Sequence, residues 1–139
     1  MIILDTNVIS ALMQREPDRV VVAWLDRQPR LSIWTTSITV FEVRQGLNTL
    51  PASKRRESLR RGFEELLHEC VADRIAAFDT AAADGAAELV AARRAKGRTG
   101  GIPDTMIAGI AIATRATIAT RNTSHFDDLP TPVVNPWAG

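Results

Sequence analysis

The first ten residues of the chain join a short apolar run to a carboxylate. Residues 2–4 are too few for a buried helix, and Asp5 follows them directly. Apolar residues then recur at helical spacing over 8–13, so the segment predicts a strand, a turn and a short helix. In open α/β folds, ligands bind beyond the carboxyl ends of the strands. Asp5 is therefore either a site residue at such an edge or a simple cap of the helix.

Short apolar segments and amphipathic helical patterns alternate along the rest of the chain. Strands are predicted at 31–35, 74–78, 116–120 and, as an edge strand, 133–134. Helices are predicted at 21–28, at 39–50 with Ser37 and Thr39 as caps, around 59–67, at 79–95 and from 103 onward. Residues 121–126 are either a polar turn or a single helical turn. This alternation predicts one α/β domain over 1–139, with a central, mainly parallel sheet flanked by helices.

Composition restricts the class of protein further. A chain of 139 residues with 45% hydrophobic and 24% charged residues is typical of a globular domain. No apolar run approaches the length of a membrane span, and the N-terminal run lacks the basic start and cleavage site of a signal peptide. Cys70 is the only cysteine, which excludes an internal disulfide and predicts a small core residue. These features predict a cytoplasmic protein that does not contact a membrane.

Basic residues are clustered although the net charge is only +1. One cluster lies within 54–61 and a second within 93–98. Each is either a solvated helix face, where Glu57 can pair with Arg61, or a contact for a phosphate backbone. The candidate nucleic-acid contacts are Arg55, Arg56, Arg60, Arg98 and Arg121.

Three carboxylates occupy equivalent places in the predicted fold. Asp5 follows the first strand, and Glu42 and Asp104 lie in the predicted first turns of later helices. Each acid could simply stabilise its helix, because a negative charge at a helix N-terminus interacts favourably with the helix dipole, and residues 39–42 even fit a capping box. In a parallel sheet, however, these positions share one edge. Clustered carboxylates there would repel unless a cation neutralised them, and Mg²⁺ or Mn²⁺ suits such oxygen ligands.

Polar residues accompany these acids. Thr6 and Asn7 follow Asp5 directly. They would either hold metal-bound water and phosphate oxygens or make local turn hydrogen bonds.

Four motifs in order make the chain resemble a known family. They are residues 3–7 (Ile-Leu-Asp-Thr-Asn), the Glu42 helix, residues 102–108 (Ile-Pro-Asp-Thr-Met-Ile-Ala) and residues 120–126 (Thr-Arg-Asn-Thr-Ser-His-Phe). In order and spacing these resemble the PIN-domain ribonucleases, and more narrowly the VapC-type toxins of toxin–antitoxin pairs. Residues 134–137 are similar to the FitB-like branch. The resemblance implies a PIN-like α/β/α sandwich and a Mg²⁺- or Mn²⁺-dependent endoribonuclease.

The resemblance also implies roles for individual residues. Asp5, Glu42 and Asp104 match the metal-binding acids of the family. Asn122 stands where a fourth acid is frequent, and its neutrality leaves open whether one metal or two are held. Thr120 would hold a water or phosphate beside the acids. His125 is either a turn histidine or a further ligand.

The family resemblance also implies partners, and two alternative functions remain open beside it. The family implies an RNA substrate, a neutralising cognate antitoxin protein and a homodimer. One rival is a catalytically weak or silent module that binds RNA or a protein partner on the same fold. Another is a phosphatase with Asp5 as nucleophile, although that chemistry favours a second acid two residues on, where this chain has Asn7.

Overall fold

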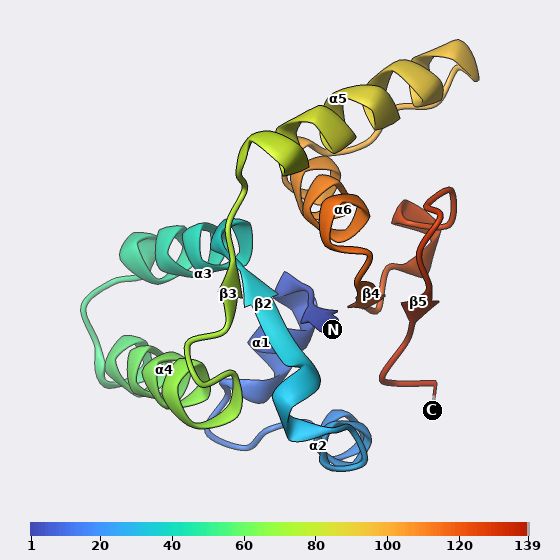
Figure 1. Cartoon of the computed structure of the whole chain (residues 1–139). Coiled ribbons are helices and arrows are strands. Elements are labelled where there is room, and N and C mark those ends of the chain that lie inside the picture. Colours follow the sequence, from blue (N-terminus) through green and yellow to red (C-terminus); the bar gives the residue numbers. More distant parts are fainter. Residues whose placement is uncertain (139) are drawn as a thin grey trace.

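A parallel β-sheet forms the centre of the molecule. The computed structural model describes residues 1–138, and its sheet has five strands in the order β3-β2-β1-β4-β5 (Figure 1). The strands are β1 (Ile2–Leu4), β2 (Ile33–Thr36), β3 (Ile75–Ala76), β4 (Thr117–Ala119) and β5 (Val133–Val134). Every strand pairing is parallel. The predicted α/β fold is confirmed, and the carboxyl ends of all these strands lie on one edge.

Helices cover both faces of this sheet (Figure 1). They are α1 (Thr6–Leu12), α2 (Arg19–Asp26), α3 (Ser37–Thr49), α4 (Lys54–Glu65), α5 (Thr80–Ala95) and α6 (Ile102–Thr114). Short turns complete the chain: 3₁₀ turns η1 (Arg30–Ser32) and η3 (Thr123–His125), and a π turn, η2 (Leu66–Cys70). Among residues 1–138, no helix combines the length and apolar character needed to cross a bilayer.

The alternation of side chains along β1 divides the core in two. Leu4 joins a cluster with residues of α1 to α4, whereas Ile3 joins a cluster with residues of α5 and α6. Successive strand residues point to opposite faces of a sheet, so this short strand anchors both helical layers. Asp5, directly after it, is held between the two cores.

Helices α5 and α6 cross closely because small residues line their contact. A Cβ atom added at Gly109 would overlap the carbonyl oxygen of Ala82 and approach the Cβ of Ala86 to 2.8 Å. A Cβ at Gly85 would lie 3.3 Å from the Gly109 carbonyl oxygen. The alanine-rich segment is therefore used to pack α6 closely, which fixes where α6 and its first residues lie.

The predicted bounds of two strands and the predicted burial of Cys70 are wrong. Strand β2 begins at Ile33 rather than at Leu31, because residues 30–32 form a 3₁₀ turn that leaves Leu31 82% exposed. Strand β3 has two residues rather than five. Cys70 is only half-buried, at the end of the π turn that follows α4.

Helix α3 begins earlier than predicted. Thr36 is its N-cap, with an extended backbone and a hydroxyl that accepts a hydrogen bond from the Thr39 amide at 3.1 Å. Ser37 and Thr39 are therefore helical residues rather than caps, and Glu42 lies in the second turn rather than the first. The last residue of the strand already has the extended conformation that an N-cap requires, so the strand passes directly into the helix.

Candidate active site

Asp5 both ends β1 and caps α1. Its Oδ1 accepts a hydrogen bond from the Thr6 amide at 2.8 Å, and the Thr120 hydroxyl donates to its Oδ2 at 2.7 Å. The residue is only 3% exposed. Asp5 therefore caps α1, as one alternative predicted, and its carboxylate also lies at the carboxyl edge of the central strand.

Burial makes the charge of Asp5 costly. Loss of hydration raises the pKa of the Asp5 carboxyl to about 6, against an ordinary value of 3.8. The bonds from Thr120 and Thr6 oppose this rise, whereas the negative charges of Asp104 and Glu42 add to it. All three predicted acids are thus close enough to interact electrostatically.

Thr120 connects Asp5 to two asparagines. Besides donating to Asp5, its hydroxyl accepts hydrogen bonds from Asn7 Nδ2 at 3.2 Å and from the Asn122 amide at 3.0 Å. Asn7 Oδ1 in turn accepts from the Arg121 amide at 3.2 Å. Asn7 thus combines a long local bond, from its Nδ2 to Asp5 Oδ2 at 3.5 Å, with contacts that join the start of α1 to the chain beyond β4.

Glu42 reaches the same edge through Thr6. The Thr6 hydroxyl donates to Glu42 Oε1 at 2.7 Å and lies 3.1 Å from the Thr39 hydroxyl. Although Glu42 lies one turn further into α3 than predicted, its long side chain still reaches the first residue of α1. Thr6 is thus a neutral bridge between the Asp5 turn and α3.

Asp104 is positioned by a different kind of partner. It lies in the first turn of α6, as predicted. Its Oδ2 lies 2.7 Å from His125 Nδ1, which belongs to the turn η3. The two side chains are 30% and 52% exposed, respectively. The structure thus places His125 in direct contact with a predicted site acid.

The chemistry of this donor set fits a hard divalent cation. The set consists of carboxylates and hydroxyls, and among residues 1–138 the groups that bond Asp5 or chiefly shift its pKa are neutral or negatively charged. Within residues 1–138, no three His, Cys, Asp or Glu side chains are close enough to form a ligand set by themselves. An ion here would therefore keep several waters, which Mg²⁺ does readily. Asn122 is exposed, and its amide is tied to Thr120.

Two predicted RNA contacts lie near the acids. Arg121 follows β4 directly, and its guanidinium stacks over the Trp137 ring at 4.8 Å. Trp137 contacts in turn the start of α2, where its Nε1 donates to the N-cap residue Asp18 at 3.2 Å. Arg98 is held more tightly, because its Nη2 donates to the Ser124 carbonyl and to Asp127, each at 2.7 Å.

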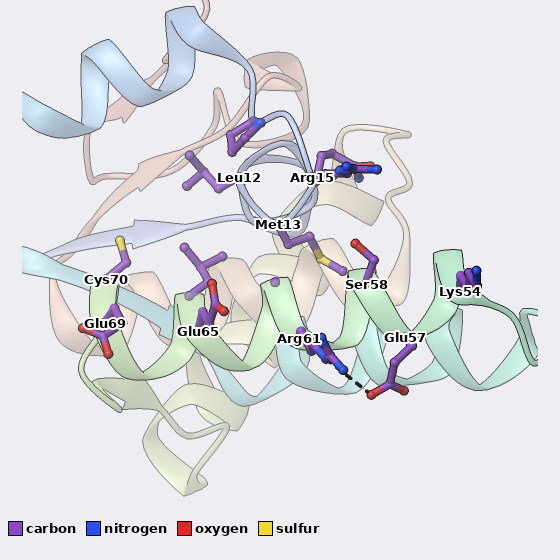
Figure 2. A pocket seen from close by; sticks show the side chains of 14 residues that line it. Leu12, Met13, Arg15, Lys54, Glu57, Ser58, Arg61, Glu65, Glu69 and Cys70 are labelled. Atoms are coloured by element: carbon purple, nitrogen blue, oxygen red, sulfur yellow. Dashed lines mark ion pairs between the residues drawn. The ribbon is translucent and has the colours of Figure 1, made fainter.

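The other predicted RNA contacts lie at a distance from the acids. Helix α4 packs against the C-terminal end of α1, whereas Asp5 caps the N-terminal end. A groove of about 670 Å³ is lined by residues of both segments there, and Figure 2 shows acidic and basic side chains mixed along it. Arg56 donates to the Leu50 carbonyl at 3.3 Å, Arg60 is paired with Glu57, and Arg55 is exposed.

The residue that sequence reasoning missed is Arg93. Its place in the sequence, within the basic cluster at 93–98, predicts a residue that faces solvent or contacts phosphate, but its side chain is buried and forms an ion pair with Asp128. Its neighbours Arg94 and Lys96 are exposed as predicted. The partner is 35 residues away in the chain, so neither spacing nor composition reveals the pair.

Comparison with known proteins identifies the class that this fold and site define. Residues 2–131 match the PIN domain family, and the chain belongs to that family. The resemblance noted in the sequence is therefore confirmed.

Individual relatives match along almost the whole chain. The plasmid stability protein StbB of Pseudomonas syringae pv. tomato is 42% identical over 137 residues, covering 99% of each chain. The VapC ribonuclease Y4jK of Sinorhizobium fredii is 41% identical, covering 99% of this chain and 98% of the relative. The toxin FitB of Neisseria gonorrhoeae is 35% identical, covering 99% of each. The crystal structure of FitAcB from that organism matches at the same identity and coverage, with a TM-score of 0.87.

Proposed function

We propose that this protein is a metal-dependent endoribonuclease that acts as the toxin of a type II toxin–antitoxin pair. The observation that carries the proposal is that Asp5, Glu42 and Asp104 lie close enough to interact at the carboxyl edge of the sheet, where burial destabilises the Asp5 carboxylate and the charges of the other two acids add to this. Such a cluster is costly for stability and is typical of sites that bind cations or polarise substrates.

The relatives support both the substrate and the biological role. One is named a VapC ribonuclease and another a toxin, and each covers nearly all of its own length in the match. The cleaved bond would accordingly be an RNA phosphodiester. The partners would be RNA, a cognate antitoxin and a second copy of the chain, in the cytoplasm.

The acids have distinct parts in the proposed reaction. Asp5 and Asp104 accept hydrogen bonds from the attacking water and hold it in line with the bond to be broken. The water oxygen forms the new bond to phosphorus, and the ribose oxygen leaves with a proton. No covalent intermediate on the enzyme is required.

Neutral residues keep this arrangement fixed. The Thr120 hydroxyl holds Asp5 Oδ2, and the Thr6 hydroxyl holds Glu42. Asn7 and Thr120 together tie the turn after β1 to the turn after β4. Because these groups carry no charge, they orient the carboxylates without neutralising them.

The metal would be held by Asp5 and Asp104, by Glu42 directly or through a water, and by Asn122 as a further neutral ligand, with waters completing its coordination. When bound, Mg²⁺ or Mn²⁺ would lower the pKa of a water and stabilise charge on the attacked phosphate. The carboxylate oxygens and the hydroxyls beside them are the ligand types these ions prefer.

A second candidate function is a catalytically weak or silent module that binds RNA or a protein partner. The observation that favours it is Asn122, which supplies no charge at the position of the fourth acid. A site with three carboxylates holds a second cation less firmly than a site with four.

Cleavage of a mixed RNA pool tests the proposal. Purified protein, freed of any bound partner, is compared with added Mg²⁺ or Mn²⁺ and with chelator, beside identically prepared Asp5→Asn and Asp84→Asn. Asp84 is an exposed acid on α5 and serves as the matched control. We expect cleavage that requires metal, survives in the control and falls at least about 100-fold in Asp5→Asn.

Two results would contradict the proposal. An Asp5→Asn protein that retained full metal-dependent cleavage would remove Asp5 from the reaction. A wild-type protein that bound RNA but cleaved none with either metal would favour the binding module.

A further inference from the structure

Arg93 is a buried charge that the proposed reaction does not use. It lies in the last turn of α5 and is only 4% exposed, although Arg94 beside it is open to solvent. Removing a guanidinium from water is unfavourable unless its donors are paired. A buried ion pair is often no better for stability than a well-packed apolar pair. A contribution to stability therefore does not by itself account for the burial of the Arg93 guanidinium.

Its guanidinium holds the turn that follows β4. Nε and Nη2 donate to the two oxygens of Asp128 at 2.8 and 2.9 Å, and Nη2 also donates to the His125 carbonyl at 2.9 Å. A two-pronged bond of this kind fixes orientation as well as distance. The residues from 125 to 128 are thus tied to the end of α5 at two points.

The same guanidinium contacts the start of α6. Nη1 lies 3.4 Å from the Thr105 hydroxyl, which itself donates to the Gly101 carbonyl at 2.9 Å. A Cβ atom added at Gly100 would come within 2.8 Å of Nη1. The loop before α6 therefore packs its backbone directly on the guanidinium.

The two segments that Arg93 joins carry His125 and Asp104. These side chains are partly exposed, yet Nδ1 of the first lies 2.7 Å from Oδ2 of the second. Arg93 donates to the backbone carbonyl of His125 and to the hydroxyl of Thr105, the residue after Asp104. Both residues also line a cavity of about 480 Å³, together with Arg93 and Arg98.

We propose that Arg93, paired with Asp128, is a positioning residue that holds His125 against Asp104. His125 then fixes one oxygen of the Asp104 carboxylate and leaves the other oriented toward the remaining acids. This inference rests on the proposed role of Asp104, but the positioning itself is independent of RNA cleavage.

Imidazole NMR tests the positioning without RNA or metal. The chain has two histidines, and the other, His68, lies beside Asp73 in a separate part of the surface. Side-chain ¹⁵N resonances, assigned with His68→Gln and measured at one pH, report the contact of His125. We expect Arg93→Lys to shift the His125 resonances and leave those of His68 in place, whereas Arg94→Lys shifts neither.

A second variant protects the test against loss of folding. Arg93→Met combined with Asp128→Leu removes both charges and leaves no unpaired ion in the interior. It is expected to keep the His68 resonances of the folded protein and to shift those of His125. If His125 resonances in both Arg93 variants coincide with those of the wild type, the proposal is overturned.

Kinetics then separate positioning from simple support of the loop. We expect both Arg93 variants to lose about tenfold in kcat with KM changed less than about twofold, because Asp104 is misoriented. Arg94→Lys should match the wild type. Shifted His125 resonances with an unchanged kcat would overturn the proposal, since the pair would then only support the loop.

Failure of the proposed function is distinguishable from failure of this inference. If the wild-type protein cleaves no RNA, the spectra of the metal-free variants still decide whether Arg93 places His125. Weaker Mn²⁺ binding by Arg93→Lys than by Arg94→Lys would then support the positioning role. Equal Mn²⁺ binding by the two variants would contradict it.

Discussion

The two halves of the candidate site hold their acids by different physical means. Asp5 and Glu42 are held by the hydroxyls of Thr120 and Thr6, which carry no charge. Asp104 is held by His125, whose turn is fixed by the ion pair of Arg93. The hydrogen bonds from neutral donors only partly offset the loss of hydration of the Asp5 carboxylate, whereas the Arg93 guanidinium stabilises the charge of the Asp128 carboxylate. The half with Asp5 therefore contains a charge that is unfavourable without a cation, and the half with Asp104 is held rigidly by its ion pair.

The same substitution should therefore have opposite effects in the two halves. Asp5 has a folded pKa of about 6, above its ordinary 3.8, so its proton favours the folded state. The cost of ionising it grows between about pH 4 and 6 and is complete above pH 6. We expect metal-free Asp5→Asn to be more stable than the wild type at pH 8, by up to about 3 kcal/mol, and to lose this advantage near pH 4.

Urea unfolding in the presence of chelator measures this gain. Asp84→Asn, on the exposed face of α5, provides the control for removing an acid elsewhere. Equal stability of Asp5→Asn and the wild type at pH 8 would show that the Asp5 charge is not destabilising. Added Mg²⁺ should raise the stability of the wild type more than that of Asp5→Asn.

Asp128→Asn should act in the other direction. The bond from Arg93 lowers the pKa of the Asp128 carboxyl, so its charge stabilises the fold. That stability is present above about pH 4 and is lost as the pH falls further, through the lowered folded value. We expect Asp128→Asn to lower the free energy of unfolding at pH 8 by about 2 to 3 kcal/mol, because the Arg93 charge stays buried. A stabilised Asp128→Asn protein in urea unfolding would refute the contrast between the halves.

Thr120→Val tests whether a neutral donor orients Asp5. The change removes the 2.7 Å bond to Asp5 Oδ2 and both bonds that the hydroxyl accepts. We expect kcat for RNA cleavage to fall about tenfold, which corresponds to about 1.4 kcal/mol. Thr114→Val, which removes a hydroxyl bonded only within α6, is the matched control. Equal kcat values for the two variants would exclude an orienting role for Thr120.

The smallest expected effect is on RNA affinity, when single arginines around the site are replaced. Arg121 is exposed beside Asn122, whereas Arg60 on α4 is already paired with Glu57. In an Asp5→Asn background, which we expect to bind RNA without cutting it, Arg121→Ala should weaken RNA binding a few-fold and lower the salt slope by about one. Arg60→Ala should change neither value. Titrations at several salt concentrations measure both, and a larger effect of Arg60→Ala would place the RNA on α4.

The sequence predicts the neutral half of the site better than the charged half. Asp5 can be predicted because an apolar strand ends at it, whereas Thr120 was singled out through the family resemblance. Glu42 was placed one turn too early, since Thr36 rather than a later residue caps α3. Strand ends are local features, so periodicity finds them.

The charged half depends on contacts that no local pattern contains. Arg93 lies among exposed basic residues, and its burial is decided by Asp128, 35 residues later. His125 meets Asp104 across 21 residues. Likewise, the apolar character of Leu31 predicted burial, but the turn before β2 leaves it outside. Tertiary packing decides these positions.

The placement of β1 at the middle of the sheet has a consequence for synthesis of the chain. Strand β4, which pairs with β1, and the Thr120 hydroxyl, which donates to Asp5, come more than 110 residues later in the chain. Such distant pairing forms late, after the intervening chain is available. A ribosome would therefore carry a nascent chain that cannot cut RNA until nearly all of this domain has emerged.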